Sequence, residues 1–179
     1  MSVNEELSEH SEHAKDPFDR NVAVTMAIIA AVLAIVSVMG QVFATEELLA
    51  QQQASDQWAY YQAKTIRRYE SDIARDMFKA APSGETNAKS AETYAHNAER
   101  YEKEGEEIQA EARKLEAESR LKGQEALRMH VGEVFMEVGI VFASLAILTK
   151  RRLVWLTSMI SAGIGVAIAA TAIFIHLRA

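Results

Sequence analysis

The chain lacks cysteine altogether and carries only two prolines and eight glycines among its 179 residues. The absence of cysteine excludes a disulfide framework, a thiolate metal site and a cysteine nucleophile, and it leaves the redox compartment open. No Ser-His-Asp arrangement and no glycine-rich phosphate loop is present. The five histidines are scattered at His10, His13, His96, His130 and His176. We therefore expect a protein that is not an enzyme and has no cofactor and no metal.

Positively charged residues are outnumbered by negatively charged ones. Lysine and arginine number 19 against 25 aspartates and glutamates, which gives a formal net charge of -6. Nucleic-acid binding usually requires a basic face. The charge balance therefore argues against a nucleic-acid partner.

The first 20 residues form a polar, acidic tail. His10 and His13 are three residues apart, but no third ligand follows at a metal-site spacing, so a solvated tail is the preferred interpretation. The small residues around Ala44 could suggest a cleaved signal peptide. The acidic leader and the long apolar run after it favour an uncleaved helix instead.

Three long apolar segments dominate the rest of the sequence. They cover residues 21–44, 130–149 and 153–177. A helix needs about 20 apolar residues to cross a bilayer, and a backbone inside lipid must satisfy its own hydrogen bonds. The sequence therefore predicts an all-α membrane protein with three transmembrane helices and the lipid bilayer as its partner.

The segment between the first two apolar runs, residues 45–129, is polar and rich in helix formers. After Ala44, neither proline nor glycine occurs before Pro82. We expect the first helix to continue to about Ala80, followed by a turn at residues 81–86. A second helix should begin near Asn87 or Ser90 and run into the second apolar segment. The sequence thus predicts a long antiparallel hairpin.

The second arm of this hairpin has a seven-residue repeat. Small side chains recur at Ala91, Ala98, Gly105, Ala112, Ser119 and Ala126. Mostly larger ones recur at Tyr94, Tyr101, Ile108, Leu115, Lys122 and Met129. The two series alternate at spacings of three and four, which is the heptad pattern of a coiled coil. These residues are the predicted coiled-coil core.

The first arm should pair with the second through complementary charges. Its basic side chains are Lys64, Arg67 and Arg68. Pairing about the turn brings them near the acidic Glu99, Glu102 and Glu104. Such pairs mainly fix register, because exposed ion pairs contribute only about 0–1 kcal/mol each.

The apolar heptad of the first arm is weaker. Ile66, Tyr69, Ile73 and Met77 fit a core stripe, but Gln52, Ser55 and Gln62 fall in the same stripe. Such an arm cannot bury all its apolar residues against one neighbour. We therefore expect contacts with other subunits.

The connection between the second and third apolar segments is fully basic, at Lys150, Arg151 and Arg152. Short basic loops remain in the cytoplasm. Three crossings place the N-terminal tail on the same side. The hairpin and the C-terminus should then be periplasmic, in a bacterial cytoplasmic (inner) membrane.

Polar residues inside the apolar segments form a candidate intramembrane cluster. Glu133 and Glu137 share a helical face. By helix depth they lie on the same side of the bilayer as Gln41, Thr171 and His176. A buried carboxylate suggests an ion or proton site. A structural role, with protonated Glu137 hydrogen-bonded to Gln41 or Thr171, is the preferred interpretation.

Close helix packing is indicated by small residues four apart in the third apolar segment, at Ser161, Gly165 and Ala169. The first apolar segment is similarly rich in alanine. Whether these faces meet within one chain or between chains stays open. Three helices form a thin bundle, so we expect a homo-oligomer.

The stretch from Ala54 to Lys64, ASDQWAYYQAK, resembles a signature of an uncharacterised bacterial membrane family catalogued as a domain of unknown function. The resemblance implies the same helical layout, but no activity, substrate or cofactor. It draws attention to Asp56, Gln57, Trp58, Tyr60 and Tyr61. These residues could form an assembly or recognition surface, or they could pack inside the hairpin.

The sequence therefore favours a non-enzymatic, self-assembling integral membrane protein with a structural, scaffold or accessory role. An alternative is an oligomeric ion channel or proton-linked transporter that uses an intramembrane carboxylate. Another membrane protein is a further possible partner.

Overall fold

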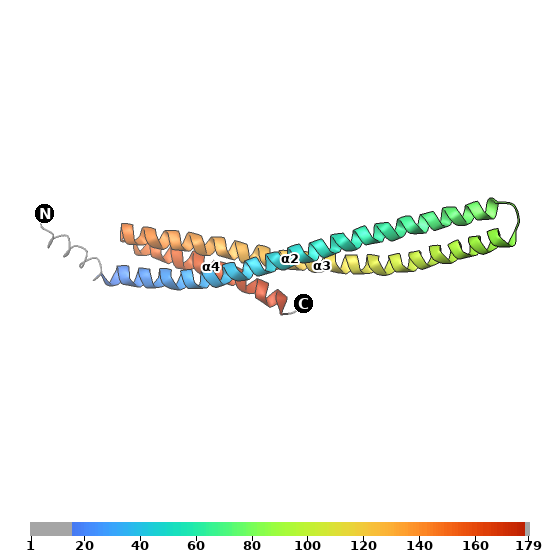
Figure 1. Cartoon of the computed structure of the whole chain (residues 1–179). Coiled ribbons are helices and arrows are strands. Elements are labelled where there is room, and N and C mark those ends of the chain that lie inside the picture. The colour runs from blue at the N-terminus through green and yellow to red at the C-terminus, as the bar shows by residue number, and fades with distance from the viewer. Residues whose placement is uncertain (1–15, 178–179) are drawn as a thin grey trace. The chain divides into compact units, whose positions relative to one another are not determined.

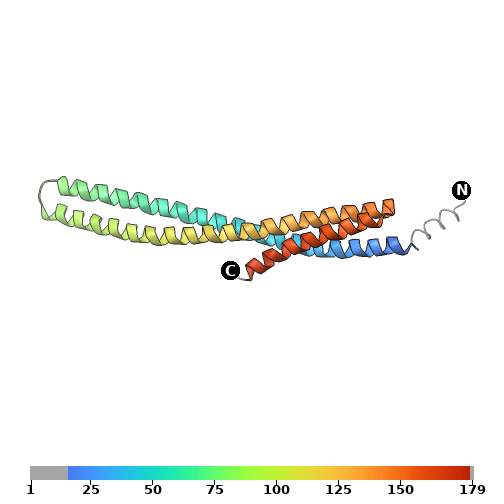
Figure 2. The ribbon, with the colours of Figure 1, turned by 180° about the vertical axis from the view of Figure 1, so that it is seen from behind.

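The computed structural model describes residues 16–177, and this part of the chain is helical apart from two short turns (Figure 1). Helix α2 covers Pro17–Ala80, α3 covers Glu85–Thr149 and α4 covers Arg152–His176. The two long helices run antiparallel and pack against each other, which both ribbon views agree on (Figure 2). The all-helical prediction is confirmed. His10 and His13 lie outside the described residues.

Helix α2 begins four residues before the predicted apolar segment. The Phe18 amide N–H donates to Oδ1 of Asp16 at 2.9 Å, and Pro17 occupies the first helical position. An aspartate that caps the helix followed by a proline is a common helix start, because proline has no amide hydrogen to leave unsatisfied. The Asp16-Pro17 pair thus starts the helix. From there α2 continues without interruption to Ala80, as predicted.

The turn between the long helices is shorter than predicted. It covers residues 81–84, and α3 begins at Glu85 rather than near Asn87 or Ser90. The Asn87 side chain donates to the Pro82 carbonyl oxygen at 2.9 Å, and the Ala88 amide donates to the Gly84 oxygen at 3.1 Å. These bonds satisfy backbone groups at the helix start.

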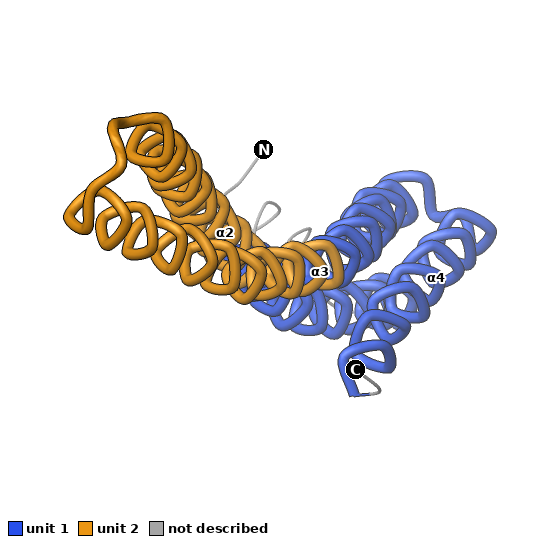
Figure 3. Tube along the Cα trace, turned by 90° about the vertical axis from the view of Figure 1, so that its right-hand side faces the viewer, with its two compact units in different colours: residues 1–45, 122–179 blue, residues 46–121 orange. Residues whose placement is uncertain are grey.

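The chain divides into two compact units (Figure 3). Unit 1 comprises residues 1–45 and 122–179, of which 16–45 and 122–177 are described, and unit 2 comprises residues 46–121. Unit 1 contains the three apolar segments. Unit 2 contains most of the predicted hairpin arms.

In unit 1, α3 and α4 approach each other through small residues. A Cβ atom added to Gly139 would lie 3.0 Å from the Ser158 carbonyl oxygen. Gly165 and Ala169 face α3 of the same chain, whereas a Cβ at Gly163 would meet nothing within 4 Å. The small-residue spacing of α4 is therefore used for packing within the chain, which the sequence had left open.

The unit 1 part of α2 packs with a strict seven-residue repeat. Its buried side chains are Val22, Ile29, Val36 and Phe43. They meet buried residues of α3, including Met129 and Met136. The outer faces remain apolar and exposed, with Ile28, Ile35, Val38, Val141 and Ile160 each at least half exposed. Unit 1 is thus apolar on both its inner and outer surfaces.

The basic turn between α3 and α4 folds back on the start of α2. Lys150 adopts a left-handed backbone conformation, with φ of 52°. Its ammonium group contacts the carboxylates of Asp16, at 2.9 Å, and Asp19. The hydrogen bonds to Asp19 and Asp16 raise the pKa of Lys150, and the same contact lowers the pKa of Asp16. Arg151 and Arg152 remain exposed.

Candidate functional site

The heptad of α3 lines the face that α2 covers in unit 2. The small members Ala91, Ala98, Gly105, Ala112 and Ser119 are all buried. The large members Tyr94, Tyr101, Ile108 and Leu115 are half-buried. Near the turn, the rings of Phe78 and Tyr94 stack with centroids 5.7 Å apart. The buried small side chains let the two helices approach closely, and the larger ones pack beside the contact.

The expectation that the apolar residues of the first arm form a core stripe is wrong. Ile66, Tyr69, Ile73 and Met77 are 57%, 54%, 62% and 69% exposed, and they lie on the side of α2 away from α3. The buried and half-buried face of α2 instead contains Ala50, Ala54, Tyr61, Lys64, Arg68, Ser71 and Phe78. Long basic side chains can cover an apolar neighbour with their alkyl stems while their charged ends reach a partner. The inward face of α2 thus combines small residues and aromatic rings with the stems of two basic side chains.

The best-defined of these ion pairs joins Lys64 to Glu104. The Lys64 ammonium lies 2.5 Å from the Glu104 carboxylate, with 13% of the lysine side chain and 36% of the glutamate side chain exposed. The ammonium also lies 5.2 Å from the ring centroid of Tyr60 and 5.4 Å from that of Tyr101. The Glu104 hydrogen bond raises the pKa of Lys64, and the same bond lowers the pKa of Glu104.

A second pair joins Arg68 to Glu102 at 2.8 Å. The prediction that basic groups of the first arm meet acidic groups of the second is thus confirmed at two places. Glu99 behaves differently, because its carboxylate pairs with Lys103 of its own helix at 2.8 Å. This pair is exposed at both ends.

Trp58 and Tyr61 point toward α3. The indole N–H of Trp58 donates to Glu116 at 3.0 Å, and the two rings meet edge to face, with centroids 5.7 Å apart. A Cβ added to Gly105 would lie 3.5 Å from the Tyr61 ring, so this glycine makes room for it. These two members of the signature pack inside the arm pair.

The other members of the signature are less enclosed. Tyr60 is 51% exposed, Asp56 is exposed and Gln57 is half-buried. Tyr60 and Asp56 are thus the most exposed of the five side chains.

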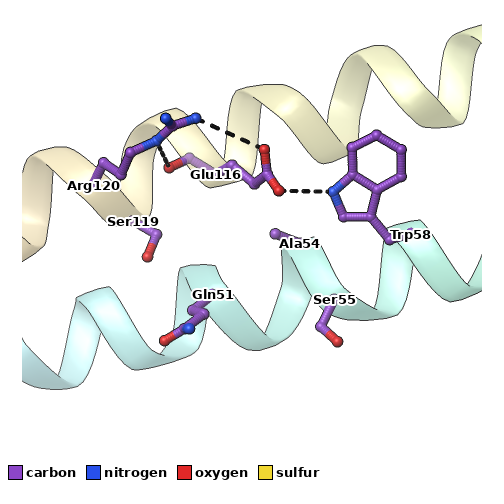
Figure 4. A pocket seen from close by; sticks show the side chains of 7 residues that line it. All are labelled: Gln51, Ala54, Ser55, Trp58, Glu116, Ser119 and Arg120. Carbon is purple, nitrogen blue, oxygen red and sulfur yellow. Dashed lines mark hydrogen bonds and ion pairs between the residues drawn. The ribbon is translucent and has the colours of Figure 1, made fainter.

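A shallow groove of about 480 Å³ opens beside Trp58 (Figure 4). Its lining residues are Gln51, Ala54, Ser55, Trp58, Glu116, Ser119 and Arg120. Ala54 and Ser119 are the two buried residues in this lining. The Glu116 carboxylate there is already engaged by Trp58 and, at 3.8 Å, by Arg120.

The two outward faces of unit 2 differ in character. We call Ile66, Tyr69, Ile73 and Met77 of α2 the outward stripe. The outward face of α3 is charged, with exposed side chains at Glu92, Glu99, Lys103, Glu106, Glu107 and Lys114. The arm pair thus has one charged side and one apolar stripe.

In unit 1, the five residues of the predicted intramembrane cluster do not converge. Gln41 and Glu137 are exposed, and neither side chain has a polar partner within residues 16–177. Glu133 lies 3.3 Å from the His130 ring and beside the Ser37 hydroxyl. The five residues lie at similar depths along their helices, but their side chains do not meet at one site.

The other two members contact residues that the sequence did not single out. Thr171 Oγ accepts a hydrogen bond from Arg128 at 3.1 Å. The imidazole of His176 lies 3.4 Å from the carboxylate of Glu125, and its ring centroid is 5.3 Å from that of Phe43.

Glu125 is the buried charge that the sequence interpretation missed. Its side chain is fully buried, and neither carboxylate oxygen has a hydrogen-bond partner within the described chain. The nearest basic side chains are His176, at 3.4 Å, and Lys122, at 3.7 Å. The sequence could have indicated this burial, because Glu125 directly precedes Ala126 of the small series and so lies at the edge of the packed face of α3.

No group of three histidine or acidic side chains within residues 16–177 is arranged to hold a metal ion. Comparison with curated proteins and with solved structures found no match to the chain. One family model does match, over residues 18–175, which is nearly the whole chain. This match agrees with the resemblance carried by the ASDQWAYYQAK stretch, and the chain therefore belongs to the family described as Domain of unknown function (DUF4337).

Proposed function

We propose that this chain is a non-enzymatic integral membrane protein that self-assembles and presents the α2–α3 arm pair outside the bilayer. Each of the three helices in residues 16–177 contains a segment long and apolar enough to cross a membrane. Exposed aliphatic side chains on the outer faces of these segments support this proposal, because contact with lipid removes them from water. The polar arm pair of unit 2 belongs in water.

The proposed orientation places the basic turn in the cytoplasm and the arm pair in the periplasm of a bacterial inner membrane. Lys150 is paired with Asp16 and Asp19, while Arg151 and Arg152 are exposed. Acidic residues near a basic loop have little effect on its retention in the cytoplasm, so the ion pairs of Lys150 do not change the proposed orientation.

The outward stripe is the observation that carries the assembly proposal. Its four side chains present roughly 500 Å² of surface at their exposed fractions, since a large side chain carries about 150–250 Å². This is comparable to the largest apolar patch of an ordinary monomer, which often marks an interaction site. Here the patch lies on a helix pair that is otherwise highly charged, where an apolar stripe has no role in packing within the chain.

Co-purification of two differently tagged copies from one membrane tests this proposal. The variant combines Ile66→Glu and Ile73→Glu, which place charges in the outward stripe without touching the α2–α3 contact. We expect co-purification to be lost, while membrane insertion and helix content persist. Substitution of Trp58 and Tyr61 would be less informative, because these residues pack against α3.

Thr93→Glu combined with Ala110→Glu provides the matched control. Both residues are exposed on α3 and the substitutions add the same charge. This control should co-purify like the wild type. Equal co-purification of the two double variants would contradict assembly through the outward stripe.

An oligomeric channel or proton-linked transporter is the second candidate function. Glu137 favours it, because this exposed carboxyl has no partner within residues 16–177 and lies in an apolar segment. Such a group avoids lipid by facing water or another subunit. Ion or proton flux into liposomes should then fall on Glu137→Gln. Flux that is unchanged by this substitution would remove the argument for a pore.

A further inference from the structure

We infer that the outward stripe of α2 docks on the same stripe of a second copy of this chain, with the two α2 helices parallel and in register. The inference rests on the proposed function, since it requires a chain that assembles in a membrane. It adds the partner surface, the direction and the alignment of the contact.

The first argument for a second copy comes from the surfaces that unit 2 offers. Within residues 46–121, the outward face of α3 is charged and the face of α2 toward α3 is already covered. Burial of the outward stripe against the charged face would remove charged groups from water without compensation. The matching apolar surface on another copy is therefore the same stripe.

The second argument is the area of the contact. Two stripes of roughly 500 Å² each would bury about 1,000 Å², which is near the lower limit of a specific protein interface. An interface of this size is weak between freely diffusing proteins. Confinement of both chains to one membrane raises their effective concentration, which makes a small contact sufficient.

The shared membrane also gives the direction of the contact. Chains inserted with the same orientation are related by a rotation about the membrane normal. For α2 arms that run along this normal, such a rotation keeps the two helices parallel and places residues of the same number at the same height. An antiparallel contact would require copies that approach from two opposite membranes.

The spacing along α2 fits a parallel two-helix contact. Ala59, Ile66 and Ile73 are seven residues apart, and Gln62 and Tyr69 lie between them at spacings of three and four. All five side chains are exposed in the single chain. Isoleucine at the first core position with leucine at the second favours two parallel strands; α2 has the isoleucines, and Gln62 and Tyr69 occupy the second position.

Gln62 has a specific place in this contact. In a parallel, in-register pair its side-chain amide would meet the same amide of the second copy, and each can donate to and accept from the other. Gln62 is the one polar core position between residues 59 and 73, and a polar core position lowers stability but fixes the register of two helices. Gln62 interrupts the apolar pattern of the first arm, and in this contact it fixes the register of the two helices.

Cysteine cross-linking of the full chain in native membrane vesicles tests the inference, because the natural sequence has no cysteine. The single variants Ile66→Cys and Ile73→Cys should each give a disulfide-linked dimer after mild oxidation. Glu106→Cys, on the exposed outward face of α3, is the control and should remain monomeric under the same conditions.

A mixed experiment tests the direction. Membranes that contain both Ile66→Cys and Met77→Cys chains, with different tags, should give mostly dimers of like chains. A predominant Ile66→Cys to Met77→Cys product would overturn the parallel arrangement, because only antiparallel helices bring those positions together.

The outcomes separate the inference from the proposed function. If tagged copies still co-purify but neither single variant cross-links above the control, the chain assembles through another surface and the inference fails alone. If co-purification and cross-linking are both absent, the proposed self-assembly fails as well.

Discussion

Gly132 of α3 and Gly165 of α4 lie so close together that a Cβ atom added to Gly132 would sit 2.7 Å from the Gly165 carbonyl oxygen. No real side chain tolerates this distance, so the backbones meet directly. Gly132→Ala should force the two helices apart and destabilise unit 1 by about 1–3 kcal/mol, the usual cost of overpacking.

Thermal unfolding in detergent, followed by circular dichroism, measures this cost. Gly163→Ala, on the neighbouring helix α4, is the control, since a Cβ there meets nothing within 4 Å. It should be neutral or slightly stabilising, because alanine is the better helix former. Equal unfolding temperatures for the two variants would disprove the close approach of α3 and α4.

Much of this fold was predictable from local features of the sequence. The length of the first helix follows from the absence of proline and glycine between Ala44 and Pro82, and the turn follows from Pro82 and Gly84. The small and large series of α3 identified its packed face, because a seven-residue repeat that is continuous over several turns leaves little choice of face.

The face of α2 was not predictable in the same way. Two faces of this arm could pack against α3, and the face with Ile66 and Ile73 has the stronger hydrophobic pattern. The structure turns Lys64 and Arg68 inward instead, because their stems pack on α3 and their charges reach Glu104 and Glu102. A hydrophobic repeat in one helix does not reveal which charged residues the partner helix presents to it.

The site residues show a related limit. Depth along a helix is readable from sequence, but rotation about its axis is not, so Glu137 and Gln41 could not be placed on one face. Glu125 was missed because it lies before the second apolar segment, in a stretch where other glutamates are exposed. Its burial depends on neighbours from helices distant in sequence.

The Lys64–Glu104 pair predicts a pH dependence of stability. The pKa of Glu104 is lowered in the folded chain, so its contribution is present above the unfolded pKa near 4.5 and is lost as pH falls through the folded value. The pKa of Lys64 is raised, so its contribution is present below the unfolded pKa near 10.5 and is lost as pH rises through the folded value. The full effect should therefore extend from about pH 5 to pH 10.

Glu104→Gln tests this pair by its midpoint of thermal unfolding at pH 7 and at pH 3. We expect a lower midpoint than the wild type at pH 7 and a much smaller difference at pH 3. Glu99→Gln is the control, because the exposed Glu99–Lys103 pair lies within one helix and should matter little. A difference at pH 7 no larger than that of the control would argue against a role for the pair in joining the arms.

Glu125 predicts opposite results for two substitutions. Glu125→Ala should destabilise unit 1 by roughly 2–4 kcal/mol, because it leaves a cavity and removes the partner of nearby cations. Glu125→Met keeps the volume and removes a buried carboxylate without hydrogen-bond partners, so it should be neutral or stabilising.

Unfolding of both variants in the same detergent measures the difference. Lys122 and His176 tolerate the methionine because their side chains keep 15% and 46% exposure. A methionine variant as unstable as the alanine variant would mean that the Glu125 charge itself holds the helices together.

The proposed orientation predicts which cysteines an impermeant maleimide can reach. Glu106→Cys should be labelled from the periplasm in cells with a permeable outer membrane. Arg151→Cys should be labelled only after the inner membrane is opened. The reverse pattern would show that the basic turn lies outside and that the positive charges do not determine the topology.

Native mass spectrometry of the detergent-solubilised wild-type protein measures self-assembly without any substitution. We expect one closed oligomer of two or more chains, and the Ile66→Glu, Ile73→Glu variant should shift it toward a single chain. A wild-type protein that is monomeric under the mildest detergent conditions would disprove self-assembly and leave the outward stripe for a different partner.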